Sequence, residues 1–126
     1  MTTVLTYGTF DVLHYGHIRI FERARALGDR LIVGVSTDAF TRKKGKEPYL
    51  SFDDRCRLVR SLRFVDDVFP EECWEQKRGD ILRYQAGIFV MGEDWTGKFD
   101  HLAELCQVIY LPRTEVVSST LLRAMI

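Results

Sequence analysis

The chain has 126 residues, which is enough for one domain and too few for two independent hydrophobic cores. Hydrophobic residues make up 46% of it, aromatic residues 12% and charged residues 29%, a composition typical of water-soluble globular proteins that excludes disordered, fibrous and membrane-spanning classes. Lysine plus arginine number 18 and aspartate plus glutamate number 18, so a net charge of zero gives no general attraction to nucleic acid or to an anionic membrane.

The sequence carries no signal for export and no membrane anchor, so we expect a cytoplasmic protein. Apolar runs such as residues 31–35 are far shorter than the ~20 residues that a membrane helix needs. The N-terminus lacks the basic start of a secretory signal. Three cysteines without a CxxC spacing predict reduced thiols, rather than a disulfide framework or a cysteine-rich zinc site.

Strands and helices alternate in the first part of the chain. Residues 3–7 are β-branched and aromatic and stop at Gly8, which predicts a strand. Residues 17–27 repeat apolar side chains at three- and four-residue spacing and predict a helix. Residues 30–36 form an apolar run without alternation, as expected for a strand that helices cover on both faces of a parallel sheet.

The alternation continues to the C-terminus. Basic residues surround Gly45 in a segment, 41–48, that we expect to be mobile, and Ser51 then caps a helix that runs to about residue 63. Further strands are expected at 65–69, 87–91 and 107–111, and further helices at 75–85, at 99–106 and, capped by Ser118, at the C-terminal end. This order predicts an α/β fold: a single Rossmann-like domain over residues 1–126, with a parallel sheet of about five strands, right-handed crossovers and helices on both faces.

Ligands of such folds bind beyond the carboxyl ends of the strands. The first predicted strand is followed by His14, Gly16 and His17, just where a helix begins. Imidazoles, a glycine that allows close approach of the backbone and the N-H groups of a helix N-terminus suit a phosphate. Two alternatives stay open. The histidines could cap the helix and bind no ligand. Alternatively, they could bind zinc together with Asp11, although no further zinc ligand is apparent.

A second polar cluster follows the last predicted strand. Arg113 offers a forked cationic donor, and hydroxyl groups of the segment 113–120 precede the final helix. A cluster of hydroxyl groups alone is also typical of a surface loop with an ordinary helix cap. In the same chain as the HxGH motif at residues 14–17, it favours a nucleoside triphosphate site.

Several segments resemble the cytidylyltransferase family of nucleotidyltransferases: GTFDVLHYGH, STD, WEQK, MGEDWTGKFD and RTEVVSST. The WEQK, GEDWTGKFD and RTEVVSST segments are most similar to members that act on glycerol phosphate. The resemblance implies transfer of a cytidylyl group from CTP to a small polyol phosphate, glycerol 3-phosphate, giving CDP-glycerol and pyrophosphate by in-line attack at the α-phosphorus. It further implies Mg²⁺ brought with CTP, a homodimer, and a role in wall or capsule polymer synthesis.

The resemblance also implies roles for individual residues. The residues expected to bind the nucleotide are Thr9, Phe10, His14, His17, Lys46, Asp94, Arg113, Thr114, Ser118, Ser119 and Thr120. Those expected to act in catalysis, by stabilising the charge that forms during transfer, are His14, His17, Lys44 and Arg113. Asp94 follows a predicted strand, where its carboxylate could accept a hydrogen bond from the cytosine amino group or from a ribose hydroxyl.

The acceptor is expected to contact Lys44 and Lys77, with Arg55 and Arg63 as further phosphate ligands. Without the resemblance, residues 42–46 would be interpreted as a solvated charged turn. Arg55 and Arg63 could equally form ion pairs with Asp54, Asp66 or Asp67. Asp11 and Asp38 could orient basic groups or help to hold magnesium, and Trp74 and Trp95 could line the pocket or simply pack.

The chain departs from the family at Val116 and Val117, where glycine and isoleucine are usual. A β-branched valine resists the positive φ and the close approach to a ligand that glycine permits. Alternative functions are therefore a related nucleotidyltransferase that uses ATP or another polyol or sugar phosphate, and a catalytically silent nucleotide-binding regulatory subunit. A nucleic-acid-binding module is disfavoured because the charge is balanced and no basic stripe is present.

Overall fold

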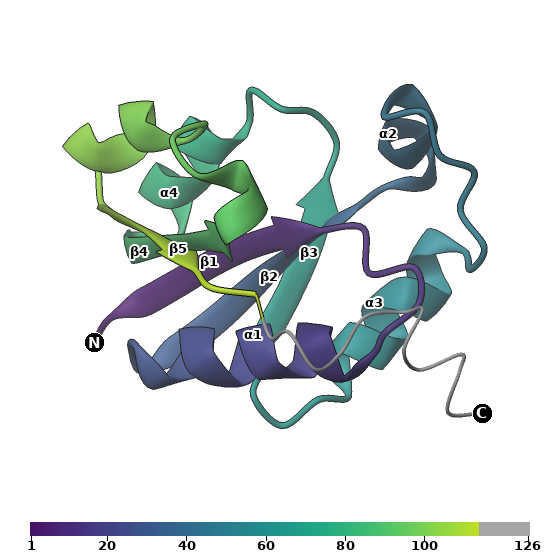
Figure 1. The fold of residues 1–126 in the computed structure, drawn as a ribbon, viewed down its shortest axis with the longest axis horizontal. Coiled ribbons are helices and arrows are strands. Elements are labelled where there is room, and N and C mark those ends of the chain that lie inside the picture. Colours follow the sequence, from purple (N-terminus) through teal and green to yellow (C-terminus); the bar gives the residue numbers. More distant parts are fainter. Residues whose placement is uncertain (114–126) are drawn as a thin grey trace.

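The computed structural model describes residues 1–113 and shows a five-stranded parallel sheet in the order β3-β2-β1-β4-β5 (Figure 1). The strands are β1 (Thr3–Gly8), β2 (Arg30–Ser36), β3 (Asp67–Glu71), β4 (Ala86–Gly92) and β5 (Gln107–Leu111). The helices are α1 (Tyr15–Ala26), α2 (Asp38–Lys43), α3 (Phe52–Arg60) and α4 (Lys77–Arg83), followed by the short 3-10 turns η1 (Glu93–Trp95) and η2 (Asp100–Glu104). The predicted fold class is confirmed.

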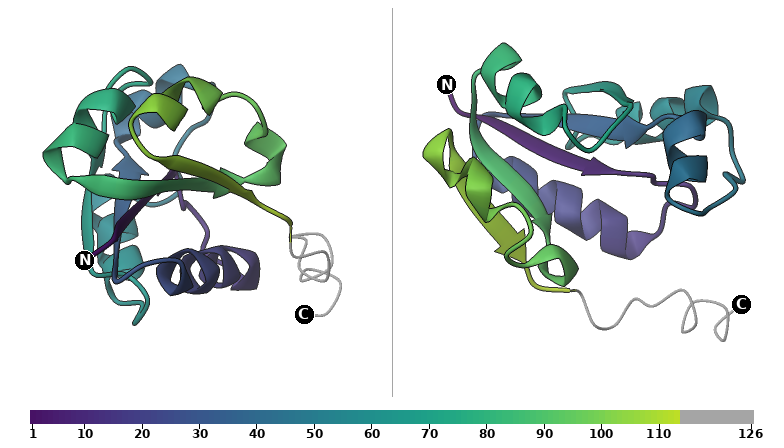
Figure 2. Two further views of the ribbon diagram at one scale, coloured as in Figure 1. Left: turned by 90° about the vertical axis from the view of Figure 1, so that its left-hand side faces the viewer. Right: turned by 90° about the horizontal axis from the view of Figure 1, so that it is seen from above.

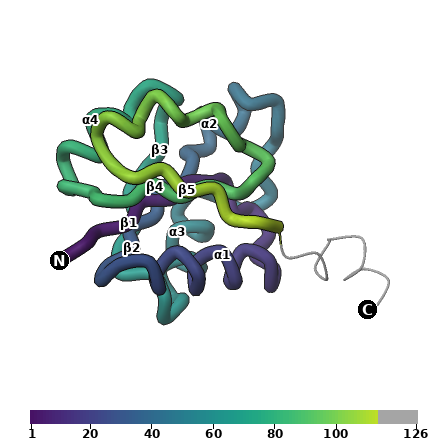
Figure 3. The backbone as a smooth tube through the Cα atoms, turned by 60° about the vertical axis from the view of Figure 1, so that its left-hand side comes forward, coloured from purple at the N-terminus to yellow at the C-terminus, as the bar shows by residue number. Residues whose placement is uncertain are grey.

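Helices cover both faces of the sheet, so the three inner strands β1, β2 and β4 are buried along most of their length. α1 and α3 lie on one face of the sheet and α4 lies on the other (Figures 2 and 3). Phe21 of α1 and Val59 of α3 belong to one core cluster, and Ile81 of α4 belongs to the other. Successive residues of a strand point to opposite faces. Accordingly, Val4 of β1 joins the first cluster and Leu5 joins the second, and both are fully buried.

The first strand of the chain is the central strand of the sheet. β1 pairs in parallel with β2 on one side and with β4 on the other, and Leu5 lies opposite both Ile32 and Phe89. The chain leaves β1 towards β2 and returns later to β4 on the opposite side. The carboxyl ends of β1 and β4 therefore flank a reversal of strand order, where α/β sheets bind their ligands.

One helix was not predicted. α2 (Asp38–Lys43) occupies the start of the segment that the sequence predicted to be mobile. Thr37 caps it by accepting a hydrogen bond from the Phe40 N-H at 3.1 Å, and Phe40 itself is buried. The helix ends before Gly45, which has a φ of +86°. The run of basic residues obscured a short helix that one buried aromatic side chain anchors.

Two other elements differ from the prediction. β3 (Asp67–Glu71) begins two residues later than expected and includes Pro70, which is tolerated because β3 is an edge strand. The helix expected at 99–106 is a 3-10 turn, η2 (Asp100–Glu104). The final helix predicted after Ser118 lies outside the described residues. Within residues 1–113, no helix is long and apolar enough to span a bilayer.

Gly8, the last residue of β1, has no room for a side chain. A Cβ there would lie 2.6 Å from Cζ of Phe10, whose ring folds back over the strand end. We expect Gly8→Ala to lower the free energy of unfolding by about 1–3 kcal/mol, because the ring or the backbone must move. Urea denaturation measures this loss. Gly79→Ala is the matched control, since nothing lies within 4 Å of a Cβ at Gly79 in α4. An equal loss in both variants would contradict the explanation.

Candidate active site

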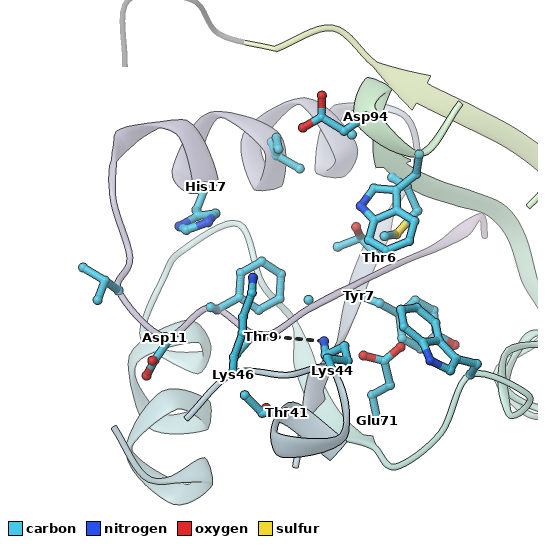
Figure 4. A pocket seen from close by; sticks show the side chains of 18 of the residues that line it. Thr6, Tyr7, Thr9, Asp11, His17, Thr41, Lys44, Lys46, Glu71 and Asp94 are labelled. Atoms are coloured by element: carbon cyan, nitrogen blue, oxygen red, sulfur yellow. Dashed lines mark hydrogen bonds between the residues drawn. The ribbon is translucent and has the colours of Figure 1, made fainter. Parts of the chain in front are cut away.

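A cavity of about 890 Å³ opens at the carboxyl edge of the sheet, next to the ends of β1 and β4 (Figure 4). This volume is in the range of small-molecule sites in proteins. The predicted site residues among its lining are Thr9, Phe10, His14, His17, Lys44, Lys46, Lys77 and Asp94. Residues from four separate segments of the chain therefore meet at one place, as the sequence predicted for the strand ends.

The two histidines form the N-terminus of α1. His14 is the N-cap residue, and its Nδ1 accepts a hydrogen bond from the Gly16 N-H at 3.0 Å. Nδ1 of His17 accepts one from the His14 N-H at 3.3 Å, and the two rings stack with centroids 3.9 Å apart. The helix therefore begins at Tyr15, two residues earlier than predicted. Because both Nδ1 atoms are acceptors, the proton of each neutral ring lies on Nε2.

The capping interpretation and the phosphate interpretation are thus compatible. The same contacts that cap α1 leave each imidazole with a donor on Nε2 and fix the orientation of its ring. Burial lowers the pKa of His17 to about 4, with a smaller contribution from the charge of His14, and burial also lowers the pKa of His14. Near neutral pH the cavity therefore presents two neutral N-H donors at a helix N-terminus.

The lowered pKa of His17 makes stability depend on pH. Between pH 6.5, the ordinary value, and about 4, the unfolded chain binds a proton at this position that the folded protein does not. The part of the free energy of unfolding that depends on neutral His17 is therefore complete above pH 6.5 and is lost as the pH falls towards 4. We expect the urea midpoint to fall over this range more steeply in the wild type than in His17→Gln. The exposed His101 gives the control, His101→Gln, and an identical slope in wild type and His17→Gln would contradict the prediction.

The Phe10 ring packs against the His17 ring. It has a φ of +52°, and its ring meets the His17 ring edge-on with centroids 5.5 Å apart and packs on Phe21 at 4.9 Å. The strained backbone turns the aromatic side chain inward between β1 and α1. Phe10 therefore contacts the cavity and at the same time fixes the position of a histidine.

Lys44 points into the cavity from the C-terminal end of α2 (Figure 4). Its Nζ donates to Thr9 Oγ1 and to Ser36 Oγ, each at 2.9 Å, and lies 4.9 Å from the centre of the Phe40 ring. Lys46 also lines the cavity, whereas Arg42 forms an exposed ion pair with Glu47. The interpretation of residues 42–46 as a solvated charged turn is therefore right for Arg42 and wrong for Lys44.

Lys77 is buried beside the cavity and is paired with a carboxylate that sequence reasoning missed. Its Nζ lies 2.5 Å from Glu71 Oε2 and 4.6 Å from the centre of the Tyr7 ring. Glu71 is the last residue of β3, and only 2% of its surface is exposed. A position at the end of a strand could have pointed to Glu71, but the strand predicted from the sequence ended at Phe69.

Arg55 does not line the cavity. It is fully buried, and its guanidinium donates to the carbonyl groups of Thr9, Ser36 and Leu50 and to the Asp38 carboxylate, at 2.6 to 3.0 Å. In this arrangement it offers no exposed nitrogen to a phosphate, and its ion-pair partner is Asp38, not one of the predicted aspartates. Asp38 does orient a basic group, as predicted.

Arg63 is also absent from the cavity lining. α3 ends at Arg60, so Arg63 does not share a helix face with Arg55; it is exposed, and its guanidinium carbon lies 4.9 Å from the centre of the Phe64 ring. Direct contacts of Arg55 and Arg63 with an acceptor therefore find no support in the arrangement of the described residues.

Asp94 lines the cavity and forms an exposed ion pair at 3.1 Å with Arg113, which is not among the lining residues. Trp74 and Trp95 both line the cavity, with ring centroids 5.7 Å apart, so they do more than pack. The other predicted nucleotide-binding residues, Thr114, Ser118, Ser119 and Thr120, lie outside the described residues.

The arrangement does not suit a zinc site. Asp11 accepts hydrogen bonds from the N-H groups of Tyr49 and Leu50, at 2.7 and 2.8 Å, and ties two loops of the site together. Across residues 1–113, no three His, Cys, Asp or Glu side chains gather in a group that could hold a metal ion. The cavity instead collects ammonium groups, imidazole N-H donors and a helix N-terminus, which together can bind a polyanion and stabilise negative charge that forms on it.

The chain is similar to known proteins along most of its length. A family model described as cytidylyltransferase-like matches residues 5–125. The glycerol-3-phosphate cytidylyltransferase of Bacillus subtilis (strain 168) is 52% identical over 120 residues, which cover 95% of this chain and 93% of that protein. The glycerol-3-phosphate cytidylyltransferase of Staphylococcus aureus (strain NCTC 8325 / PS 47) is 50% identical, with 95% and 91% covered.

A solved structure shares the fold. The lipopolysaccharide core biosynthesis protein from Thermoplasma volcanium GSS1 superposes with a TM-score of 0.77 at 25% sequence identity, covering 90% of this chain and 97% of that chain. The residues that the family model matches include every residue of the cavity lining.

Proposed function

The chain belongs to the cytidylyltransferase-like family of nucleotidyltransferases, and we propose that it transfers a cytidylyl group from CTP to glycerol 3-phosphate, giving CDP-glycerol and pyrophosphate. The observation that carries this proposal is a single cavity lined by His14 and His17 at a helix N-terminus and by four lysines. The names of the two bacterial relatives, each about half identical to the chain, supply the substrates.

The reaction needs positioning and charge stabilisation, and no protein nucleophile. A phosphate oxygen of the acceptor attacks the α-phosphorus of CTP, and the bond from that phosphorus to the bridging oxygen breaks as pyrophosphate leaves. His14 and His17 hold the triphosphate through Nε2-H, where negative charge grows in the transition state. Lys46 assists them. This assignment rests on the fixed ring orientation that the two Nδ1 hydrogen bonds impose.

Lys44 and Lys77 hold the acceptor phosphate at the other end of the cavity. Lys77 is buried and Lys44 is half-buried, and an aromatic ring lies within 5 Å of each ammonium group. Shielding strengthens the attraction between an ammonium group and a phosphate. Two positive charges also reduce the repulsion between the acceptor phosphate and the triphosphate that it must approach.

Asp94, Arg113 and the segment that follows bind the remaining parts of CTP. Asp94 accepts a hydrogen bond from the cytosine amino group or a ribose hydroxyl, and Arg113 contacts the triphosphate together with Thr114, Ser118, Ser119 and Thr120. The exposed ion pair between Asp94 and Arg113 supports this assignment, because it holds Arg113 beside a carboxylate that lines the cavity and costs little to exchange for ligand contacts.

Mg²⁺ enters the site with the triphosphate. The carboxylates near the cavity have protein partners: Asp11 holds two backbone N-H groups, Glu71 holds Lys77, and Asp94 holds Arg113. The donor set thus suits a nucleotide whose phosphates already carry the ion. When bound, Mg²⁺ would neutralise part of the triphosphate charge.

The setting of the enzyme follows from the family resemblance. We propose a cytoplasmic homodimer whose CDP-glycerol serves wall or capsule polymer synthesis. A nucleic acid partner is not expected, because the net charge of the chain is zero.

Pyrophosphate release tests the function. CTP, ATP, GTP and UTP are each combined with Mg²⁺ and with glycerol 3-phosphate or other polyol and sugar phosphates, and controls omit the acceptor. Release only with CTP and glycerol 3-phosphate is the expected result, and it would mean that Val116 is tolerated in a cytidine site. Release with another pair would reassign the substrates. Nucleotide binding without release would favour the regulatory subunit.

A further inference from the structure

A single buried carboxylate connects the two lysines at the acceptor end of the cavity. Glu71 Oε2 lies 2.5 Å from Lys77 Nζ, and Glu71 Oε1 accepts a hydrogen bond from Ser36 Oγ at 2.8 Å. Ser36 Oγ in turn accepts one from Lys44 Nζ at 2.9 Å. Glu71 thus contacts Lys77 directly and is connected to Lys44 through the Ser36 hydroxyl group. Figure 4 shows Lys44 and Glu71.

This carboxylate and its three partners come from four elements of the fold. Ser36 ends β2, Glu71 ends β3, Lys44 follows α2, and Lys77 begins α4. Both carboxylate oxygens are occupied, and only 2% of the Glu71 surface is exposed, so the carboxylate has little freedom to turn. Its position therefore fixes the direction of two ammonium groups that belong to different segments.

Glu71 also supplies the negative charge in a cationic region. The charged groups that act on Lys44 are Glu71, Lys46, Lys77 and Arg55, so Glu71 is the anionic one among them. The other groups that contact Lys44 are neutral: the Thr9 and Ser36 hydroxyls and the Phe40 and Trp74 rings. Lys77 lies against the rings of Tyr7, Trp74 and Phe99, and the Tyr7 hydroxyl donates to Asp80.

We propose that Glu71 is a positioning residue for the acceptor: it supplies the shared counter-charge for Lys44 and Lys77 and aims both ammonium groups at the acceptor phosphate. This inference rests on the proposed function, in which these two lysines bind glycerol 3-phosphate. Each ammonium group has three N-H donors, so Lys77, which donates to Glu71, keeps two for a phosphate, and Lys44, which donates to Thr9 and Ser36, keeps one.

Burial makes the counter-charge necessary. It lowers the pKa of the Lys44 amino group, and the charges of Lys46, Lys77 and Arg55 act in the same direction, whereas the charge of Glu71 raises it. Without the carboxylate, Lys44 would lose its proton at a lower pH. A neutral amine attracts a phosphate dianion far less, so acceptor binding would weaken as the pH rises.

The test compares Glu71→Gln with Glu72→Gln, which removes the same charge from the adjacent exposed residue. In Glu71→Gln we expect the KM for glycerol 3-phosphate to rise about tenfold and the KM for CTP to stay within about twofold. We also expect the basic limb of the pH profile, where kcat/KM for the acceptor falls as the pH rises, to move about one unit to lower pH. Glu71→Asp, which keeps the charge, should restore the basic limb. Glu72→Gln should match the wild type.

A purely structural role for Glu71 would give a different result. Thermal stability would fall, but the two KM values and the pH profile of the remaining folded enzyme would match the wild type, and this outcome overturns the proposal. If Glu71→Gln does not fold, Ser36→Ala decides, because it breaks the connection to Lys44 and leaves the ion pair with Lys77 intact. An unchanged acceptor KM and basic limb in Ser36→Ala also overturn the proposal.

One measurement does not depend on turnover. A ¹⁵N NMR titration of the lysine amino groups gives the pKa of Lys44 in the wild type and in Glu71→Gln or Ser36→Ala. A lower pKa in the variants supports the proposal even if the wild type does not accept glycerol 3-phosphate, and an unchanged pKa overturns it. Wild-type inactivity in the pyrophosphate assay would instead count against the proposed function alone.

Discussion

Replacing His14 or His17 by alanine is expected to lower kcat by about two to four orders of magnitude, with a smaller effect on the KM for CTP. Each imidazole presents an Nε2-H donor whose direction is fixed by a hydrogen bond to its Nδ1. A donor held in place before the reaction stabilises the growing charge without reorganisation, so its loss raises the barrier more than it weakens ground-state binding. Steady-state kinetics with CTP and glycerol 3-phosphate measures both effects.

A variant of His14 separates catalysis from helix capping. His14→Ala also removes the N-cap of α1, which costs about 1 kcal/mol of stability. His14→Asn keeps a capping oxygen but has no group at the position of Nε2, so it should fold like the wild type and still be slow. His101→Ala, at an exposed histidine, is the control for both. Near-normal kcat in folded His14→Asn and His17→Ala would exclude the proposed role.

The second large effect is expected at Arg55. Arg55→Met should lower the free energy of unfolding by about 3–5 kcal/mol, because it removes the charge that pairs with Asp38 and leaves three backbone carbonyl groups without their donor. Urea or thermal denaturation measures the loss. Arg57→Met, at an exposed arginine of the same helix, should stay within about 0.5 kcal/mol of the wild type.

Kinetics of the same variant test the prediction made from the sequence. If Arg55 acts through the protein, the activity per folded molecule falls because the carbonyl groups of Thr9 and Ser36 lose the donor that holds them together. If Arg55 instead bound the acceptor directly, the KM for glycerol 3-phosphate would rise while stability stayed near that of the wild type. That second result would contradict the arrangement of Arg55 described above.

Much of the fold could be predicted because its inner strands, β1, β2 and β4, are buried on both faces. Residues 30–36 lack alternation for that reason, and the strand that they form, β2, has the predicted bounds of Arg30–Ser36. α2 could not be predicted, because a helix of six residues depends on one buried ring, Phe40, and tertiary burial is invisible in a basic segment. The end of β3 was missed because Pro70 argues against a strand until its place at the sheet edge is known.

The site could be located from the sequence, but its internal pairing could not. The position of His14 and His17 after the first strand predicted their place at the strand ends. Nothing in the sequence distinguishes Arg55, which is fully buried, from Arg57, which is exposed in the same helix. Likewise, the pairing of Glu71 with Lys77 depends on the end of β3 meeting the start of α4, which local patterns do not encode.

The central place of β1 has a consequence for synthesis of the protein. β1 (Thr3–Gly8) leaves the ribosome before the other four strands of the sheet, and one of its two neighbours, β4 (Ala86–Gly92), is translated some eighty residues later. Until then, the edge of β1 that β4 will cover presents unpaired N-H and C=O groups, and such an edge can pair with another chain. Contacts over so long a stretch of chain also slow folding. Nascent chains that stall before β4 should therefore aggregate or recruit chaperones more than stalled chains that already contain β4.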